Sequence, residues 1–209
     1  MTIGYYYPHP STRSFVKRWF DIVGSLVGLL ILAIAFLPIA IAIKLDSPGP
    51  IFYSQKRYGL YGKPFRIWKF RSMIEEADIL KAFVPNQAQG WLFKNDNDPR
   101  ITCVGRFLRC TSLDELPQFW NVLLGEMSLV GTRPPTADEV VHYSPYHWQR
   151  LNVKPGITGE WQVSGRSVLK DFEAVVALDL HYQQQWHPWY DLKIVFKTIY
   201  VVFARIGAC

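Results

Sequence analysis

The longest apolar segment of the chain runs from Ile22 to Ile43 and contains no charged residue. A helix of this length would be about 33 Å long, which is enough to cross a bilayer. Basic residues flank both of its ends, with Lys17 and Arg18 before it and Lys44 after it. Because basic flanks favour one side of a membrane, a crossing helix would place one of them on the disfavoured side.

Pro38 lies inside this apolar segment and removes a helical hydrogen bond, so we expect the helix to bend or break there. A segment that enters the membrane, breaks near Pro38 and returns would keep both flanks in the cytoplasm. We therefore predict a re-entrant membrane helix within residues 1–46 and a cytoplasmic-face domain at residues 47–209. A simple transmembrane helix with a proline kink is the alternative.

Two segments in which β-branched or aromatic residues alternate with polar ones follow, at residues 51–57 and 65–71. The loop between them contains two glycines. This pattern predicts a β-hairpin. Its period of two places Lys69 on one face and both Trp68 and Phe70 on the other.

Parts of the remaining chain have helical spacing, separated by polar and turn-rich loops at 84–99 and 154–167. They predict a short helix at 75–83, a central helix that carries the Asp114–Glu115 pair and runs to about Leu124, and helices at 172–186 and 191–205. The last of these carries tryptophans at its flank and could lie at a membrane interface, although a packed core helix fits the same pattern. The predicted fold class is α+β: a helix-rich single domain with a β-hairpin, a re-entrant N-terminal membrane helix and interfacial amphipathic helices.

The positive charge of the chain is concentrated near the hairpin. The net charge is +6, and residues 44–71 contain seven basic side chains against one acid, Asp46. Such a patch indicates an anionic partner, which could be nucleic acid, a phosphorylated substrate or an anionic membrane surface. The neighbouring membrane segment favours a phosphate-bearing lipid or donor over nucleic acid.

Two adjacent carboxylates, Asp114 and Glu115, lie at the predicted start of a helix. If Ser112 is the N-cap, Glu115 completes a capping box; if Asp114 is the N-cap, Pro117 falls where its missing N–H costs nothing. Both registers place the carboxylates in the first turn, where the helix dipole favours ionisation by about 0.3–1 kcal/mol each. Taken alone, these residues could simply cap the helix.

Several longer motifs, in a consistent order, give the chain a more specific resemblance. They are Lys17–Arg18 with Phe20–Asp21, Lys69–Met73, Asp98–Thr102, Ser112–Gln118, Met127–Pro134, Lys154–Gly159 and Ser164–Arg166. Through them the chain resembles the bacterial monotopic phosphoglycosyl transferases, also called polyprenyl-phosphate sugar-1-phosphate transferases. The resemblance covers Lys17 to Cys209, which is nearly the whole chain.

The resemblance implies a catalytic domain on the cytoplasmic face of the bacterial inner membrane and a double-displacement reaction. Asp114 would attack the β-phosphate of a nucleoside diphosphate sugar, and the sugar-phosphate would then pass to polyprenyl phosphate. Glu115, together with Asp114, would be associated with Mg²⁺. The side chains expected near the phosphates are Lys69, Arg109, Arg133 and Arg166.

Elementary electrostatics is consistent with these roles. A carboxylate that approaches a diphosphate is repelled by about 4 kcal/mol for each unit-charge pair at 4 Å and an effective dielectric near 20. A divalent ion and nearby Lys and Arg side chains would remove that barrier. The alternative from another class is a non-catalytic membrane-attached protein whose basic hairpin binds anionic lipid or nucleic acid.

Details of the motifs narrow the expected substrate. Thr132–Pro135 and Trp161–Ser167 are closer to the hexose-1-phosphate branch than to the N-acetylhexosamine branch, so the expected donor is a UDP-hexose and the products start exopolysaccharide, capsule or O-antigen synthesis. Membrane lipids are expected partners, nucleic acid is not, and a homo-oligomer is left open. Leu37 stands before Pro38 where the family often has serine, and Glu160 occupies a usually apolar position.

Overall fold

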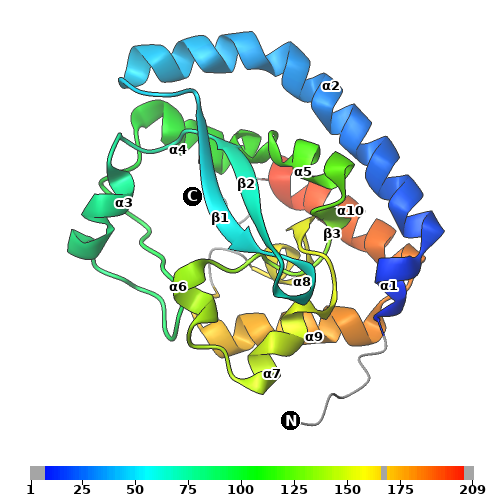
Figure 1. Cartoon of the computed structure of the whole chain (residues 1–209). Coiled ribbons are helices and arrows are strands. Elements are labelled where there is room, and N and C mark those ends of the chain that lie inside the picture. Colours follow the sequence, from blue (N-terminus) through cyan, green and yellow to red (C-terminus); the bar gives the residue numbers. More distant parts are fainter. Residues whose placement is uncertain (1–7, 166–168, 205–209) are drawn as a thin grey trace.

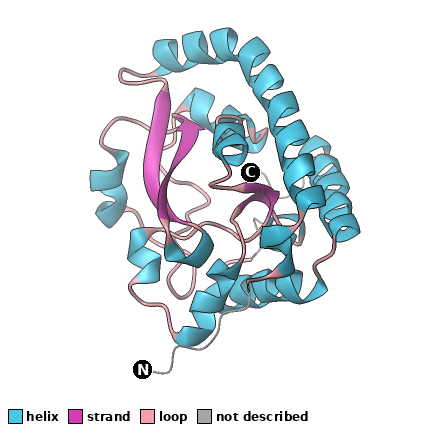
Figure 2. Cartoon of the chain, turned by 45° about the vertical axis from the view of Figure 1, so that its right-hand side comes forward, coloured by secondary structure: helices cyan, strands magenta, loops and turns pink. Residues whose placement is uncertain are grey.

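The computed structural model describes residues 8–165 and 169–204 of the 209-residue chain. A long N-terminal helix curves over a body of shorter helices that surrounds two small sheets (Figure 1). One sheet is the antiparallel hairpin of β1 (Phe52–Tyr58) and β2 (Pro64–Phe70). The other is the parallel pair of β3 (Ser128–Val130) and β4 (Gly156–Thr158), which lies apart from the hairpin (Figure 2). The helix-rich α+β prediction is confirmed.

Most of the α-helices are short; the long ones are the second, which has 32 residues, and the last two. The α-helices are α1 (Pro10–Arg13), α2 (Phe15–Asp46), α3 (Ala77–Leu80), α4 (Cys103–Cys110), α5 (Gln118–Leu124), α6 (Ala137–Val140), α7 (Pro145–Trp148), α8 (Glu160–Val163), α9 (Phe172–Gln185) and α10 (Pro188–Phe203). The 3₁₀ turns are η1 (Leu60–Gly62), η2 (Lys81–Phe83), η3 (Leu113–Glu115) and η4 (Gln149–Asn152).

Helix α2 is a single helix of 32 residues, and Pro38 lies inside it rather than at a break between two helices. It bends over the domain instead of interrupting its helical path (Figure 1). Within the described residues it is the one helix long and apolar enough to cross a membrane. The expected local break at Pro38 is therefore replaced by a continuous, curved helix.

One side of α2 packs against the domain along most of its length. Gly24 and Gly28 allow this close approach, because a Cβ at Gly24 would lie 2.5 Å from Leu129 and one at Gly28 would lie 2.3 Å from the Phe119 ring. Further along, Ile39 and Ile43 join a core cluster with residues of β2, α4 and the segment before α5. The opposite side presents apolar side chains to the exterior: Trp19, Val23, Leu26, Val27, Leu30, Ile31, Ile34, Leu37, Ile41 and Leu45.

Buried polar contacts fix the N-terminal end of α2. Lys17 Nζ forms a 2.6 Å ion pair with Asp191 of α10 and also donates to the Val130 carbonyl. Arg18 donates to two carbonyls at the end of α5, and Asp21 accepts hydrogen bonds from β3. The basic residues that precede the apolar segment are thus anchors to the domain.

A second set of contacts fixes the C-terminal end of α2. The Asp46 carboxylate accepts a 2.9 Å hydrogen bond from the Val104 N–H at the start of α4. Arg71, which follows β2 and is buried, donates to the carbonyls of Ile43, Ser47 and Pro48. A cation at this position satisfies carbonyls in the last turn of the helix and in the two residues that follow it. Both ends of α2 are therefore held by the same domain.

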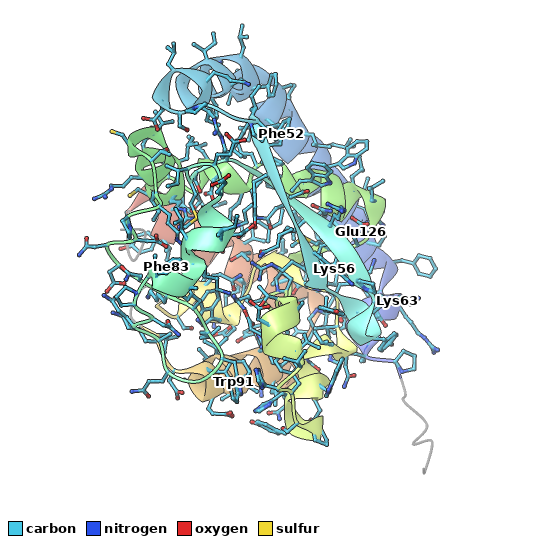
Figure 3. The ribbon with its side chains drawn as sticks, turned by 60° about the vertical axis from the view of Figure 1, so that its left-hand side comes forward. Phe52, Lys56, Lys63, Phe83, Trp91 and Glu126 are labelled. Carbon is cyan, nitrogen blue, oxygen red and sulfur yellow. The ribbon has the colours of Figure 1, made fainter. Side chains whose placement is uncertain are left out.

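The open end of the hairpin lies beside α2, and its turn lies at the far side of the molecule. Phe52 lies at the end beside α2 and Lys63 at the opposite end (Figure 3). The rings of Phe36, Phe52 and Phe70 stack, with Phe52 and Phe70 centroids 5.3 Å apart. This aromatic contact joins one face of the hairpin to α2 and leaves Lys69 on the other face, as predicted.

Candidate active site

The segment that carries Asp114 and Glu115 is a tight turn between two helices. Helix α4 ends at Cys110, Ser112 takes a left-handed conformation with φ 56°, and η3 spans the carboxylates before α5 starts at Gln118. Neither predicted capping register forms, because Ser112 makes no capping hydrogen bond and helix α5 begins three residues after Glu115. A non-glycine residue in the left-handed region is uncommon and is often found at functional sites.

Lys69 lies beside both carboxylates. Its Nζ is 2.7 Å from Glu115 Oε1 and 3.9 Å from Asp114 Oδ2. Asp114 is almost entirely buried, whereas Lys69 and Glu115 are partly open to solvent. The structure therefore brings together the predicted nucleophile, its acidic neighbour and one predicted phosphate-binding cation.

Asn121 fixes the distance between the hairpin and the carboxylate turn. Its buried side chain accepts a hydrogen bond from the Trp68 N–H and donates a 2.7 Å hydrogen bond to the Arg66 carbonyl. These contacts join α5 to the edge of β2 immediately before Lys69. Since η3 directly precedes α5, the same contacts place Lys69 against Asp114 and Glu115.

A cavity of about 690 Å³ is lined by Arg109 at the end of α4, the helix that leads into this turn, and by Arg133. The side chains of Lys69, Asp114 and Glu115 are not part of its lining. The lining includes five basic and two acidic side chains, so it is suited to an anionic ligand. Arg109 Nε donates a 2.9 Å hydrogen bond to the Ser72 hydroxyl, which holds the guanidinium at the cavity wall. Trp161 lines the same cavity, with its ring 5.9 Å from the Arg133 guanidinium.

Arg133 is oriented by an ion pair with the buried Glu139. The two side chains form a bidentate ion pair with N–O distances of 2.7 and 3.0 Å, and Glu139 is buried. Burial would raise the pKa of Glu139, but the charge and hydrogen bonds of Arg133 outweigh it and lower that pKa. Glu139 is therefore ionised at neutral pH and orients the Arg133 guanidinium.

A second buried ion pair supports Arg133 from the interior. Arg150 is fully buried and donates to Asp179 Oδ2 through Nε at 2.8 Å and Nη2 at 2.6 Å. Its remaining N–H groups reach the Tyr143 hydroxyl and the Arg133 carbonyl. This pair connects α9 to the loop that carries Arg133.

Comparison with known proteins identifies the family. A family model described as bacterial sugar transferase matches residues 12–205. The chain belongs to this family. The galactosyl transferase CpsE of Streptococcus agalactiae is 50% identical over 194 residues, which cover 92% of this chain and 43% of that protein.

Other relatives of the chain have related names. The UDP-glucose:undecaprenyl-phosphate glucose-1-phosphate transferase of Escherichia coli is 44% identical over 212 residues, or 96% of this chain and 43% of that protein. The exopolysaccharide production protein ExoY of Rhizobium meliloti is 43% identical over 198 residues, or 92% of this chain and 87% of that protein. The chain thus spans less than half the length of the first two relatives.

The donor set at the carboxylate turn fits a metal ion shared with a substrate. No group of three or more His, Cys, Asp or Glu side chains gathers anywhere in the described ranges, so an all-protein metal cage is not formed there. Mg²⁺ commonly binds through one or two carboxylates and completes its shell with substrate phosphates and water. Asp114 and Glu115 supply such a partial set.

Two further predicted positions cannot be compared with this site. Arg166 falls outside the described residues, and Pro38, which was predicted as a break in the membrane helix, lies in α2. Glu160, which the sequence left unexplained, accepts a 2.8 Å hydrogen bond from the Tyr190 hydroxyl and so connects α8 to α10. Burial, together with the hydrogen bond to Glu160 and its negative charge, raises the pKa of Tyr190 to about 12.

Sequence reasoning missed the residues that position the arginines. Ser72 lies inside the Lys69–Met73 motif but was given no role, and Glu139 lies six residues after its partner Arg133. The segment between Arg133 and the start of α6 contains two prolines and no helix or strand, so sequence periodicity could not predict that these two side chains pair. Burial of the Glu139 carboxylate would have indicated a buried cationic partner, but burial is known only from the fold.

Proposed function

We propose that this sugar transferase moves hexose-1-phosphate from a UDP-hexose to polyprenyl phosphate and so starts exopolysaccharide or capsule synthesis. The observation that carries the proposal is the Lys69–Glu115–Asp114 cluster together with a basic cavity, in a chain of this family. Relatives described as acting on glucose or galactose support a hexose. The undecaprenyl-phosphate substrate in the name of the Escherichia coli relative supports a polyprenyl acceptor.

In the proposed first step, an Asp114 carboxylate oxygen attacks the β-phosphorus of the UDP-hexose. The bond from that phosphorus to the oxygen bridging the two phosphates breaks, and UMP leaves with the electron pair. In the second step, a phosphate oxygen of polyprenyl phosphate attacks the same phosphorus and Asp114 leaves. The product is a polyprenyl diphosphate hexose, and Asp114 returns as a carboxylate.

Lys69 has two tasks in this scheme. Its ammonium group partly neutralises Asp114 and Glu115, which lowers the repulsion between an attacking carboxylate and a diphosphate. Once the substrate is bound, the same group can donate to a phosphate oxygen and stabilise charge in the transition state. Glu115 and Asp114 would hold Mg²⁺, and the ion when bound supplies Lewis-acid stabilisation of the phosphoryl group.

The two-step route also suits the position of the enzyme at a membrane. The fixation of both ends of α2 to one domain supports a helix that stays in the near leaflet, since a spanning helix would carry one end across the bilayer. The exposed apolar side of α2 supplies the lipid-facing surface. We therefore propose a re-entrant, monotopic attachment to the bacterial inner membrane with the catalytic domain in the cytoplasm.

Accessibility of introduced cysteines tests this attachment. Single cysteines placed at Arg13 and Ser47, next to the two ends of α2, should be labelled from the same side of sealed vesicles by a membrane-impermeant reagent. Labelling of the two positions from opposite sides would show that α2 spans the bilayer and would overturn the re-entrant attachment.

An Asp114→Asn variant tests the chemistry. With UDP-glucose or UDP-galactose and undecaprenyl phosphate, we expect UMP release to fall by at least about a thousandfold, since the nucleophile is removed. Asp138→Asn is the matched control, because Asp138 is exposed and pairs only with Lys81 among the described residues. A phosphosugar adduct on Asp114 in wild-type protein would support the covalent route, and undiminished UMP release in Asp114→Asn would exclude it.

A further inference from the structure

Arg57 is a basic side chain near the site to which neither the sequence motifs nor the mechanism above gives a role. It lies in β1, opposite Phe65 of β2, and therefore on the hairpin face that also carries Lys69. Its Nη1 donates a 3.0 Å hydrogen bond to the Pro134 carbonyl, next to Arg133. Its Nε–H is buried and has no hydrogen-bond partner among the described residues.

The charges around Arg57 do not balance. Three guanidinium groups act on the Glu139 carboxylate, those of Arg133, Arg57 and Arg150. Arg133 takes both oxygens of Glu139, and Arg150 is paired with Asp179. Arg57 has no carboxylate within ion-pair distance in the described part of the chain, so this neighbourhood holds one more cation than it has paired anions.

The closeness of Arg57 to Arg133 is unfavourable without an anion. Burial and the neighbouring Arg133 charge lower the pKa of Arg57 to about 10, so the guanidinium stays protonated at neutral pH while losing some stabilisation. The charge of Glu115 acts in the opposite direction and raises that pKa, which places Arg57 within electrostatic reach of the carboxylate turn. A negatively charged ligand between Arg57 and Arg133 would offset the repulsion between the two guanidinium groups.

We infer that Arg57 and Arg133 form an anion site that binds a phosphoryl group of the substrate beside Asp114 and Glu115. A planar guanidinium with free N–H groups suits phosphate oxygens, which it can bind in a bidentate manner. The phosphoryl group could belong to the nucleotide sugar or to the polyprenyl phosphate, since both present the same oxygens. This assignment rests on the proposed transfer reaction and adds a substrate-binding residue to it.

Steady-state kinetics of Arg57→Met tests the inference and identifies the source of the phosphoryl group. We expect KM to rise by about 10- to 100-fold for the substrate whose phosphate Arg57 binds, which corresponds to losing one charge-assisted hydrogen-bond pair. A rise for UDP-hexose alone assigns the nucleotide sugar, and a rise for polyprenyl phosphate alone assigns the acceptor. Arg66→Met is the matched control, because Arg66 is an exposed arginine of the same hairpin on its opposite face.

A purely structural role for Arg57, as an anchor for the Pro134 carbonyl, gives a different result. The thermal unfolding midpoint of Arg57→Met would then fall while both KM values stayed at the wild-type level, and the anion site would be refuted. If Arg57→Met does not fold, Arg57→Lys replaces it: lysine can still donate to Pro134 but lacks the second arm. A rise of at least about fivefold in one KM supports the site, and unchanged KM values overturn it.

Direct binding separates this inference from the proposed function. Inorganic pyrophosphate binding, measured by calorimetry on the wild type, Arg57→Met and Arg66→Met, requires no turnover. Binding that is lost only in Arg57→Met would support the anion site even if wild-type protein failed to transfer hexose-1-phosphate. Equal pyrophosphate affinity in all three proteins would refute the anion site whether or not transfer occurs.

Discussion

Two ion pairs of the protein, Arg150–Asp179 and Lys69–Glu115, differ in how far they are closed to solvent. Arg150 and Asp179 are fully buried, paired through two N–H groups and surrounded by aromatic rings. Lys69 and Glu115 are also paired, but both keep part of their surface exposed. The first pair has no room for a ligand, whereas the second can exchange its partner for a substrate or an ion.

The difference separates ionisable groups that hold the fold together from those that can act on a ligand. A closed pair pays a large desolvation cost, and removal of either member leaves an uncompensated buried charge. An open pair contributes little to stability, because water screens it, yet its charges can act on a bound diphosphate. Arg133 stands between these cases, since Glu139 holds it from the buried side and the cavity lies on the other.

The largest expected effect is on stability, from a change in the closed pair. Arg150→Met should reduce the free energy of unfolding by about 3–5 kcal/mol, because Asp179 is left buried without its partner. Burial already raises the pKa of Asp179 and Arg150 opposes that rise, so the variant should also take up a proton at Asp179. Chemical denaturation in detergent measures the change.

Arg66→Met serves again as the control, here for Arg150→Met, because it makes the same substitution at an arginine that is exposed. We expect its free energy of unfolding to stay within about 0.5 kcal/mol of wild type. A similar loss of stability in both variants would mean that Arg150 contributes no more than a surface arginine, and the distinction between closed and open pairs would fail.

The next effect is on catalysis, from a change in the open pair. Lys69→Met should lower kcat for hexose-1-phosphate transfer by about a hundred- to a thousandfold, as found for the loss of one preorganised donor to a transition state. Its free energy of unfolding should change by about 1 kcal/mol or less, because the pair is partly exposed. Single-turnover UMP release and denaturation curves give the two quantities.

Lys63→Met is the control for Lys69→Met, because Lys63 is exposed at the far end of the hairpin (Figure 3). Its turnover should equal that of wild type. If Lys69→Met turned over normally while unfolding several kcal/mol more easily, the roles given to the open and closed pairs would be reversed.

Sequence patterns predicted the secondary structure of the outer elements well. The hairpin, α9 and α10 follow the predicted residues within a few positions, because alternation or helical spacing extends over many residues in each. The carboxylate turn was different: Ser112, Asp114 and Pro117 all fit helix starts, and local chemistry could not show that the helix begins only at Gln118.

The site was predictable as a set of residues and not as a set of contacts. The motifs named Lys69, Asp114 and Glu115, and the fold brings these three side chains together. The register of the hairpin, which decides that Arg57 shares a face with Lys69, depends on the loop between the strands. Likewise, Lys17 and Arg18 indicate membrane topology in the sequence, yet Lys17 pairs with Asp191 in the interior.

The smallest effect concerns Glu139, the buried partner of Arg133. Its folded pKa is lower than its ordinary value of 4.5, so its stabilising contribution is complete above that value. As the pH falls through the folded pKa, the unfolded chain binds more protons and the contribution is lost. Glu139→Gln should therefore cost about 1–3 kcal/mol at pH 7, and this cost should shrink steadily as the pH falls below 4.5 toward the folded pKa of Glu139.

Denaturation curves at several pH values between 3 and 7 test this expectation, with Glu173→Gln as the control. Glu173 is an exposed glutamate that contacts His147, and the loss of its charge should leave the pH dependence close to that of wild type. A difference between Glu139→Gln and wild type that is equally large at pH 3 and pH 7 would mean that shape, not charge, holds Arg133. In that case Arg133 would be a structural group like Arg150. Of Arg57 and Arg133, only Arg57 would then have a charge available to a substrate phosphate.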